Sequence, residues 1–143
     1  MIKSHFFRIT IYLALALYSI ILFWELYIGA SSRQHLKEFT YNIYPCKTIF
    51  SYIIDYNSNN PASFVINIIG NIVVFVPFGF LLPMAFQKQL DRLDKLLFAS
   101  VTGILVIELL QLVLKVGVFD IDDIILNSIG VVAGFVVLKV IQE

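Results

Sequence analysis

Long apolar runs alternate with short polar segments along this chain, and four of the runs have the length of a membrane span. They cover residues 9–28, 64–86, 96–114 and 124–141. Each holds about 18 to 23 residues, enough for an α-helix to cross roughly 30 Å of hydrocarbon. The run Ile72-Val73-Val74-Phe75-Val76 lacks the alternating polarity of a transmembrane β-barrel. The pattern predicts an all-α, polytopic membrane protein with four transmembrane helices in a compact bundle.

The first run has some features of a secretory signal peptide. Lys3 and Arg8 precede it, and Gly29-Ala30-Ser31-Ser32 follows it. The run is longer than a usual signal-peptide core, however, and Ile28 interrupts the small-x-small cleavage pattern. We therefore expect an uncleaved helix here.

The segment between the first two spans, residues 29–63, is too long for a hairpin turn and is rich in aromatic residues. From Pro45 onward, Ile49, Ile53 and Tyr56 recur at helical spacing. This predicts a short amphipathic helix at the membrane interface, with aromatic side chains at the level of the lipid head groups.

Composition supports the membrane assignment and excludes several other classes. The 143 residues are 59% hydrophobic and 14% charged, with a mean hydropathy of +0.89 and a net charge of zero. Soluble domains are closer to 25% charged. Without a basic excess, a nucleic-acid partner is not expected, and the chain is long enough for one domain, residues 1–143. The lone Cys46 permits no internal disulfide and reads most simply as a small apolar filler.

The orientation follows from the Lys and Arg residues that flank the spans. Four spans place both termini on one side, together with Lys and Arg at positions 3, 8, 88, 92, 95 and 139, against positions 33, 37, 47 and 115 on the other. The excess of six positive residues over four, together with a dense positive loop over residues 87–95, predicts that both termini lie in the cytoplasm.

Six polar residues lie within or at the edges of the apolar runs. They are Glu25, Asn67, Asn71, Glu108, Gln111 and Asn127. With a rise of about 1.5 Å per residue, all six fall within roughly 10 Å of the outer ends of their spans. A charge at membrane depth costs about 2.5–3.5 kcal/mol on insertion scales, so each needs a partner or a water-filled cavity.

Spacing along the helices predicts which of these side chains share a face. Asn67 and Asn71 are four residues apart, as are Asp123 and Asn127, and Glu108 and Gln111 are three apart. A polar pocket that opens toward the outer surface would satisfy them together. Its rim would be formed by Asp120, Asp122 and Asp123 of the third loop, and Arg33 and Lys37 could reach it from the first outer segment.

Each of these features also has a purely structural interpretation. The polar groups could bond one another and fix the packing, although such interhelical contacts average only about 0.6 kcal/mol. Asp122 or Asp123 could cap the fourth span, where negative charge is favoured. Gly130 and Gly134, at G-x-x-x-G spacing, allow close helix approach. We favour packing within the monomer over homodimerisation, and oligomeric state stays open.

Three segments together resemble the VanZ-like family of small bacterial membrane proteins. They are Asn67-Ile-Ile-Gly-Asn71-Ile-Val-Val-Phe75-Val-Pro77-Phe-Gly79, Glu108-Leu-Leu-Gln111, and Phe119-Asp120-Ile-Asp122-Asp123-Ile-Ile-Leu-Asn127-Ser-Ile-Gly130. Arg33 and the stretch from Tyr41 to Ile49 are also similar to the outer segment of the family. Two departures are Cys46, where the family usually has an aromatic residue, and the absence of an Arg shortly before Asp120.

The resemblance implies a role at the cell envelope and, for the founding member of the family, low-level resistance to the glycopeptide teicoplanin. It implies no enzymatic mechanism and no cofactor. We therefore favour a non-enzymatic binder of a lipidated or polar-headed ligand, such as a lipoglycopeptide or a peptidoglycan precursor, beside membrane lipid. The site residues expected are Glu108, Gln111, Asn67, Asn71, Asn127, Asp120, Asp122, Asp123 and Arg33. Two alternatives remain open: a membrane-embedded hydrolase or transferase acting on a lipid-linked substrate through the same carboxylates, and a structural partner of envelope enzymes.

Overall fold

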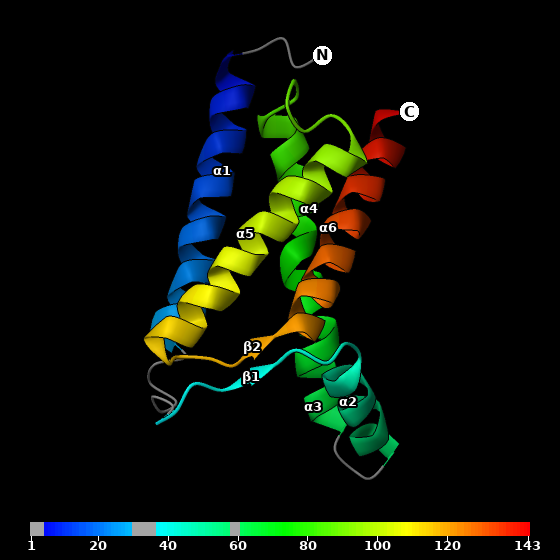
Figure 1. Ribbon diagram of the computed structural model, residues 1–143. Coiled ribbons are helices and arrows are strands. Elements are labelled where there is room, and N and C mark those ends of the chain that lie inside the picture. Colours follow the sequence, from blue (N-terminus) through cyan, green and yellow to red (C-terminus); the bar gives the residue numbers. More distant parts are fainter. Residues whose placement is uncertain (1–4, 30–36, 58–60) are drawn as a thin grey trace.

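The computed structural model describes residues 5–29, 37–57 and 61–143, and helices make up most of it (Figure 1). In chain order the helical elements are α1 (His5–Phe23), the π-helical η1 (Trp24–Gly29), α2 (Lys47–Asn57), α3 (Pro61–Phe64), the π-helical η2 (Val65–Ile69), α4 (Gly70–Ala85), α5 (Leu93–Leu114) and α6 (Ile121–Gln142). Two short strands, β1 (Tyr41–Asn42) and β2 (Phe119–Asp120), pair in parallel, with Tyr41 opposite Phe119 and Asn42 opposite Asp120.

The prediction of four membrane spans is confirmed. The helices over His5–Ile28, Val65–Ala85, Leu93–Leu114 and Ile121–Gln142 are long and apolar enough to cross a bilayer, with mean hydropathies of 2.0 to 2.3. The third and fourth helices begin three residues earlier than predicted. Their first turns contain acidic residues, Asp94 in α5 and Asp122 and Asp123 in α6, which the positive end of a helix favours. Helix α2 also confirms the short helix predicted after Pro45.

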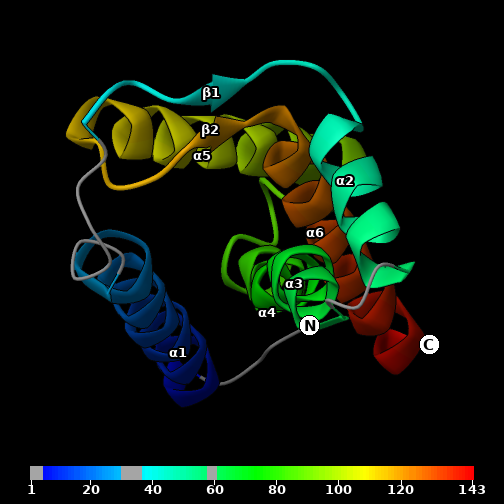
Figure 2. The same cartoon turned by 90° about the horizontal axis from the view of Figure 1, so that it is seen from below.

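The bundle has two distinct ends. Both chain termini lie at one end, called here the terminal end, and β1, β2 and α2 lie at the other, called the strand end (Figure 1). Helix α5 runs diagonally between them, from beside α6 at the terminal end to beside α1 at the strand end (Figures 1 and 2). Strand β2 then leads the chain back to the start of α6. The diagonal course of α5 opens a wedge among the helices at the strand end.

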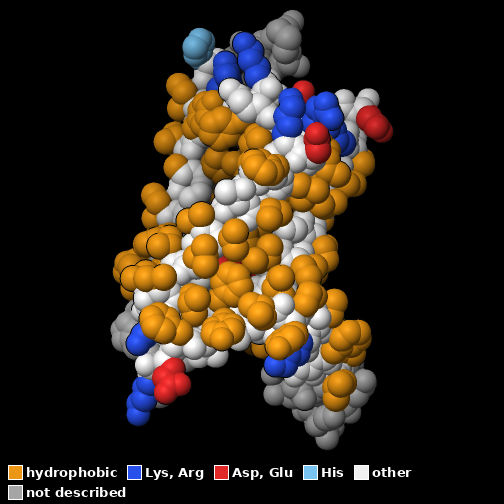
Figure 3. All heavy atoms as spheres, in the orientation of Figure 1, with side chains coloured by type: hydrophobic (Ala, Val, Ile, Leu, Met, Phe, Trp, Pro, Cys, Tyr) orange, Lys and Arg blue, Asp and Glu red, His pale blue; other side chains and the backbone are white. Residues whose placement is uncertain are grey.

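The surface is organised as a membrane protein requires. Hydrophobic side chains cover the middle of the visible face, and Lys and Arg gather at the terminal end (Figure 3). Phe98 in α5, for example, is 78% exposed. Within the described ranges, the ion pairs are Arg92–Asp94 and Lys95–Asp91, both exposed and both at the terminal end. A bilayer would cover the apolar band between the two ends.

Helices α4 and α6 form the most closely packed pair in the bundle. Gly79 of α4 lies against the Val131 backbone, while Gly130 and Gly134 of α6 lie against the backbone of α4. A Cβ atom at any of these glycines would come within about 2.1 Å of a facing carbonyl oxygen. The two glycines of the G-x-x-x-G motif therefore pack against α4 within the monomer, as predicted. Pro77 and Pro83 both lie within α4, which continues through them.

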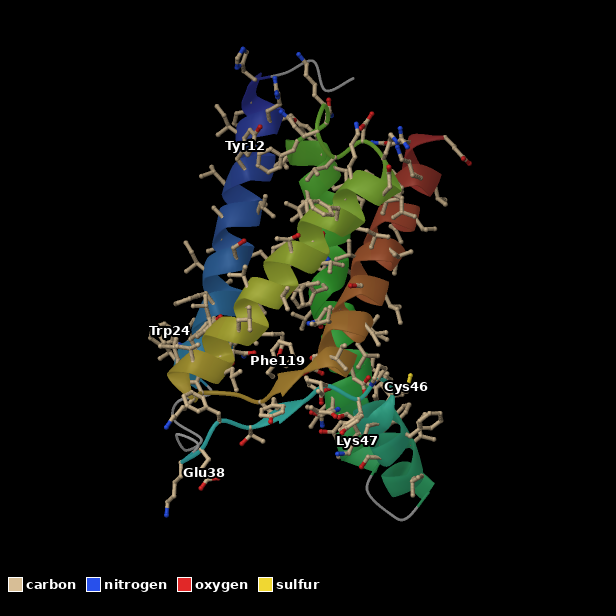
Figure 4. All side chains as sticks on the ribbon, in the orientation of Figure 1. Tyr12, Trp24, Glu38, Cys46, Lys47 and Phe119 are labelled. Atoms are coloured by element: carbon tan, nitrogen blue, oxygen red, sulfur yellow. The ribbon has the colours of Figure 1, made fainter. Side chains whose placement is uncertain are left out.

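Helix α1 is held to the bundle chiefly by tyrosine hydroxyl groups. Tyr12 donates to the Ala85 carbonyl at 2.9 Å and Tyr18 to the Val74 carbonyl at 2.8 Å. Near the strand end, Tyr27 donates to the Ile107 carbonyl of α5 at 3.0 Å. Tyr12 and Trp24 lie toward opposite ends of this helix (Figure 4). Because Ile11 is the single buried residue of α1 itself, hydrogen bonds carry an unusual share of its attachment.

Replacing Tyr12, Tyr18 and Tyr27 together with phenylalanine is therefore expected to loosen α1. Interhelical hydrogen bonds in membranes average about 0.6 kcal/mol, so the triple variant should lose about 2 kcal/mol of unfolding free energy. Unfolding by SDS in mixed micelles measures this loss. The exposed Tyr41 provides the control, since Tyr41→Phe should leave stability unchanged. Equal stability of the triple variant and the wild type would show that the hydroxyl groups do not hold α1.

Candidate functional site

A cavity of about 350 Å³ occupies the wedge at the strand end of the bundle. We call it the charged cavity. All four spans contribute to its wall. Its polar lining residues are Glu25, Asn71, Glu108, Gln111, Asp123 and Asn127. Its apolar lining residues are Leu22, Leu26, Ile66, Gly70, Val74, Phe75 and Ile107.

Glu108 and Gln111 enter the cavity from α5, one helical turn apart. Their side chains are buried, with 4% and 9% of their surface exposed. Glu108 Oε2 accepts a hydrogen bond from the backbone amide of Asp120 at 3.3 Å. The diagonal path of α5 brings these side chains to the inside of the bundle, so neither faces lipid. This is the facing predicted from their spacing.

Asn71, Asp123 and Asn127 form the opposite wall. Asn71 Nδ2 of α4 donates to Asp123 Oδ1 of α6 at 2.6 Å, which joins the two helices across the cavity. One turn further along α6, Asn127 is 5% exposed, and its Oδ1 atom has no hydrogen-bond partner among the described residues. A buried polar atom without a partner costs about 1–3 kcal/mol. It therefore marks a position where a bound molecule or water would be stabilised.

The ionisable side chains that line the cavity in the described part of the chain are all acidic. Glu25, Glu108 and Asp123 carry carboxyl groups into it, and no Lys or Arg is among the residues that line it in the described part of the chain. Interactions between charges are stronger inside a protein than in water, because the effective dielectric constant is lower. The cavity is thus suited to a molecule that bears positive charge and hydrogen-bond donors.

The side chains of Asp120 and Asp122 bond to the outer segment. Asp122 is fully buried and accepts from three backbone amides at the start of α2, those of Cys46, Thr48 and Ile49, at 2.5, 2.8 and 3.1 Å. Sequence reasoning placed Asp120 and Asp122 on the rim of the pocket, with capping of the fourth span by Asp122 or Asp123 as the structural alternative, but neither Asp120 nor Asp122 is among the residues that line the charged cavity. The cap of α6 is instead Asp120, whose side chain accepts from the Asp122 amide at 2.9 Å.

Asp120 also joins α6 to the segment around β1. Its Oδ2 accepts from Thr48 Oγ1 at 2.6 Å, and its Oδ1 from Asn42 Nδ2 at 3.0 Å. We call the contacts of Asp120 and Asp122 the aspartate clamp. Cys46 and Lys47 lie where the chain from β1 enters α2, at the foot of α6 (Figure 4). Sequence reasoning missed Asn42 and Thr48, although a threonine at a predicted helix start is a capping signal.

The remaining predicted site residues lie elsewhere. Asn67 belongs to η2 and is not among the residues that line the charged cavity. Arg33 lies outside the described residues. Lys37 is exposed, and its carbonyl accepts from Lys115 Nζ at 3.3 Å.

No three His, Cys, Asp or Glu side chains converge as a metal-binding group in the part of the chain that the structure describes. The polar side chains of the charged cavity are instead a mixture of amides and carboxylates, which is suited to hydrogen bonding with an organic head group.

Comparison with known proteins agrees with this picture. The profile of the VanZ/LLP1 family matches residues 9–142. Protein VanZ of Enterococcus faecium is 39% identical over 71 residues, a stretch that covers 50% of this chain and 41% of that protein. The match thus spans less than half of the length of this relative, and no solved structure matches the chain. With four apolar spans and a family match over nearly its whole length, this multi-pass membrane protein belongs to the VanZ/LLP1 family.

Proposed function

We propose that this protein is a non-enzymatic binder in the bacterial cytoplasmic membrane, and that the charged cavity holds the cationic, hydrogen-bonding head of an amphiphile. The observation that carries the proposal is the buried Asn127 amide, whose oxygen has no partner among the described residues. It lies beside carboxyl groups in a wall to which the described residues contribute no Lys or Arg. A protonated amine donates up to three hydrogen bonds and would satisfy both.

The orientation predicted from the sequence places this cavity in the outer leaflet. Lys and Arg are concentrated at the terminal end, as expected for the cytoplasmic side (Figure 3). Both termini then lie in the cytoplasm, and the strand end faces outward. A ligand would reach the cavity from the outer leaflet, where lipid-anchored envelope precursors and acylated glycopeptides are located.

The residues of the cavity would have different roles in binding. Glu108 supplies the buried negative charge, and Asp123 a second carboxylate held by Asn71. Gln111 and Asn127 orient the head group through hydrogen bonds. In a relative of Protein VanZ, this chemistry fits the capture of a lipoglycopeptide such as teicoplanin, or of a peptidoglycan precursor. Capture at the membrane would change the concentration of the drug at its target.

The substitution Glu108→Gln tests this proposal, because it removes the charge and retains the size and an acceptor for the Asp120 amide. Hydrogen bonds to charged groups contribute about 1.5–3 kcal/mol, so affinity for a cationic amphiphile should fall at least about tenfold. Binding to the purified protein in nanodiscs measures affinity. In cells that depend on this protein, growth on teicoplanin should fall while growth on vancomycin, which has no acyl chain, stays the same.

The matched control is Asp94→Asn, which removes an exposed carboxylate at the terminal end of α5. This variant should bind and protect as the wild type does. Unchanged binding and unchanged growth of a folded Glu108→Gln variant would contradict the proposed role of the cavity.

A further inference from the structure

A second, apolar cavity of about 200 Å³ adjoins the charged cavity, and we call it the tail cavity. It lies among α4, α5 and α6. Its lining residues are Phe75, Phe78, Leu82, Ala99, Ser100, Gly103, Ile104, Ile107 and Val131. Phe75 and Ile107 line both cavities, so the two spaces lie next to each other on either side of these side chains.

The tail cavity extends from the charged cavity toward the terminal end. On α5, Ser100 to Ile107 precede Glu108, and on α4, Phe78 and Leu82 follow Phe75. Since α4 and α5 run in opposite directions, both helices give the same direction for the cavity. The eight residues from Glu108 back to Ser100 correspond to about 12 Å along the helix.

Small residues on α5 create this space. Ala99, Ser100 and Gly103 line the α5 side of the cavity, and Phe75 and Phe78 line the α4 side. Ala99 and Gly103 are exposed, and a Cβ atom at Gly103 would meet nothing within 4 Å, so the cavity opens on the membrane-facing surface of the bundle. Lining atoms that face this opening gain dispersion contacts only from the molecule that fills it. In a bilayer, the hydrocarbon chains of lipids and other amphiphiles are available to fill the tail cavity.

The hydroxyl group of Ser100 differs in its hydrogen bonding from the other helical hydroxyl groups. The hydroxyl groups of Thr10, Ser19, Thr102 and Ser128 each donate to the carbonyl four residues earlier in their helix. Ser100 Oγ, in a side chain that is 9% exposed, has no partner among the described residues. The tail cavity therefore has one polar atom in its otherwise apolar wall, at which a water molecule or a polar group would be stabilised.

We propose that the tail cavity holds the hydrocarbon chain of the same amphiphile whose cationic head lies at Glu108. This inference rests on the proposed function and deepens it, since it defines the ligand as an alkylammonium-type amphiphile with one chain inside the bundle. Two observations carry the assignment. The two cavities are adjacent at Phe75 and Ile107, and an acidic cavity beside an apolar one matches a cationic head and its chain.

Photolabelling in nanodiscs of phosphatidylcholine tests the position of the chain directly. The probe is dodecylammonium with a diazirine at the end of its chain, and mass spectrometry maps the labelled residues. In the wild type we expect label on α5 between Ala99 and Ile104. Gly103→Phe fills the tail cavity without a backbone clash and should reduce this label at least tenfold. The matched control is Val106→Phe, at a residue that is 50% exposed and does not line this cavity, and it should keep the label.

Head-group binding is measured in parallel with butylammonium, whose chain is too short to reach Ser100. Retained butylammonium binding in Gly103→Phe, together with lost labelling, supports the proposal. Label spread over exposed residues of α5 that do not line the tail cavity, such as Val106, or unchanged label in Gly103→Phe, overturns the tail cavity and leaves the head site intact. Loss of labelling in Glu108→Gln is expected, and binding of both amines without regard to Glu108 would overturn the proposed function itself.

Discussion

Replacing Gly134 with leucine is expected to prevent this chain from reaching its folded state. A Cβ atom at this position would lie 2.0 Å from the Val76 carbonyl oxygen and 2.9 Å from the Phe80 amide nitrogen of α4. These are backbone atoms, so no rotation of a side chain relieves the clash. Overpacking costs about 1–3 kcal/mol where side chains can adjust, and more where they cannot. We expect a loss of at least about 3 kcal/mol against a total of about 5–15 kcal/mol.

Unfolding in mixed micelles and the yield of monodisperse protein measure this effect. Gly103→Leu is the matched control, because the same change on α5 meets open space. It should leave stability equal to or above that of the wild type, since glycine weakens a helix. If both variants were equally stable, the close approach of α4 and α6 would be wrong.

Replacing Asp122 with alanine should release the outer segment from the bundle. The fully buried carboxylate is the acceptor for the Cys46, Thr48 and Ile49 amides, and its removal leaves three donors without a partner. Each unsatisfied buried donor costs about 1–3 kcal/mol, and partial hydration lowers the sum to about 3 kcal/mol. Hydrogen exchange should accelerate over β1 and α2 while α4 and α6 stay protected.

Two further variants separate the clamp from general destabilisation. Asp122→Asn retains one acceptor oxygen and should show an intermediate rate of exchange. Asp94→Ala removes an exposed carboxylate from an ion pair worth about 1 kcal/mol or less, and should change nothing in α2. Unchanged exchange over α2 in Asp122→Ala would show that the aspartate clamp does not hold this helix.

The sequence predicts the four helices well because membrane insertion depends on uninterrupted hydrophobic length. It also predicts that Asn71, Glu108 and Asn127 meet, since the rise per residue gives their depth and the helical period gives their facing. Both quantities are local, and both hold for a regular α-helix. Asn67 departs from the prediction, since it lies in the π-helical η2 and is not among the residues that line the charged cavity. A π-helical segment has no clear signal in the sequence.

The aspartate clamp and the tail cavity were harder to predict. Asp122 is bonded to backbone amides more than seventy positions away, and backbone groups have no sequence signature of their own. The small residues of the tail cavity, Ala99, Ser100 and Gly103, are also typical of helices that pack closely. Because α5 runs diagonally, these small residues lie apart from α4 and line a cavity and do not form a close helix contact.

The hydrogen bond from the Asp120 amide to Glu108 connects the aspartate clamp with the charged cavity. Asp120 is at once the cap of α6, the acceptor for Thr48 and Asn42, and the donor to the carboxylate at the head site. A ligand that donates a hydrogen bond to Glu108 Oε2 would compete with the Asp120 amide for this acceptor. Conversely, a more ordered segment around β1 and α2 would strengthen the hydrogen bond from the Asp120 amide to Glu108. Under the proposed function, ligand occupancy and the order of β1 and α2 are therefore expected to be thermodynamically linked. Reciprocity then requires that a molecule that binds β1 and α2 also alters the affinity of the cavity for its ligand.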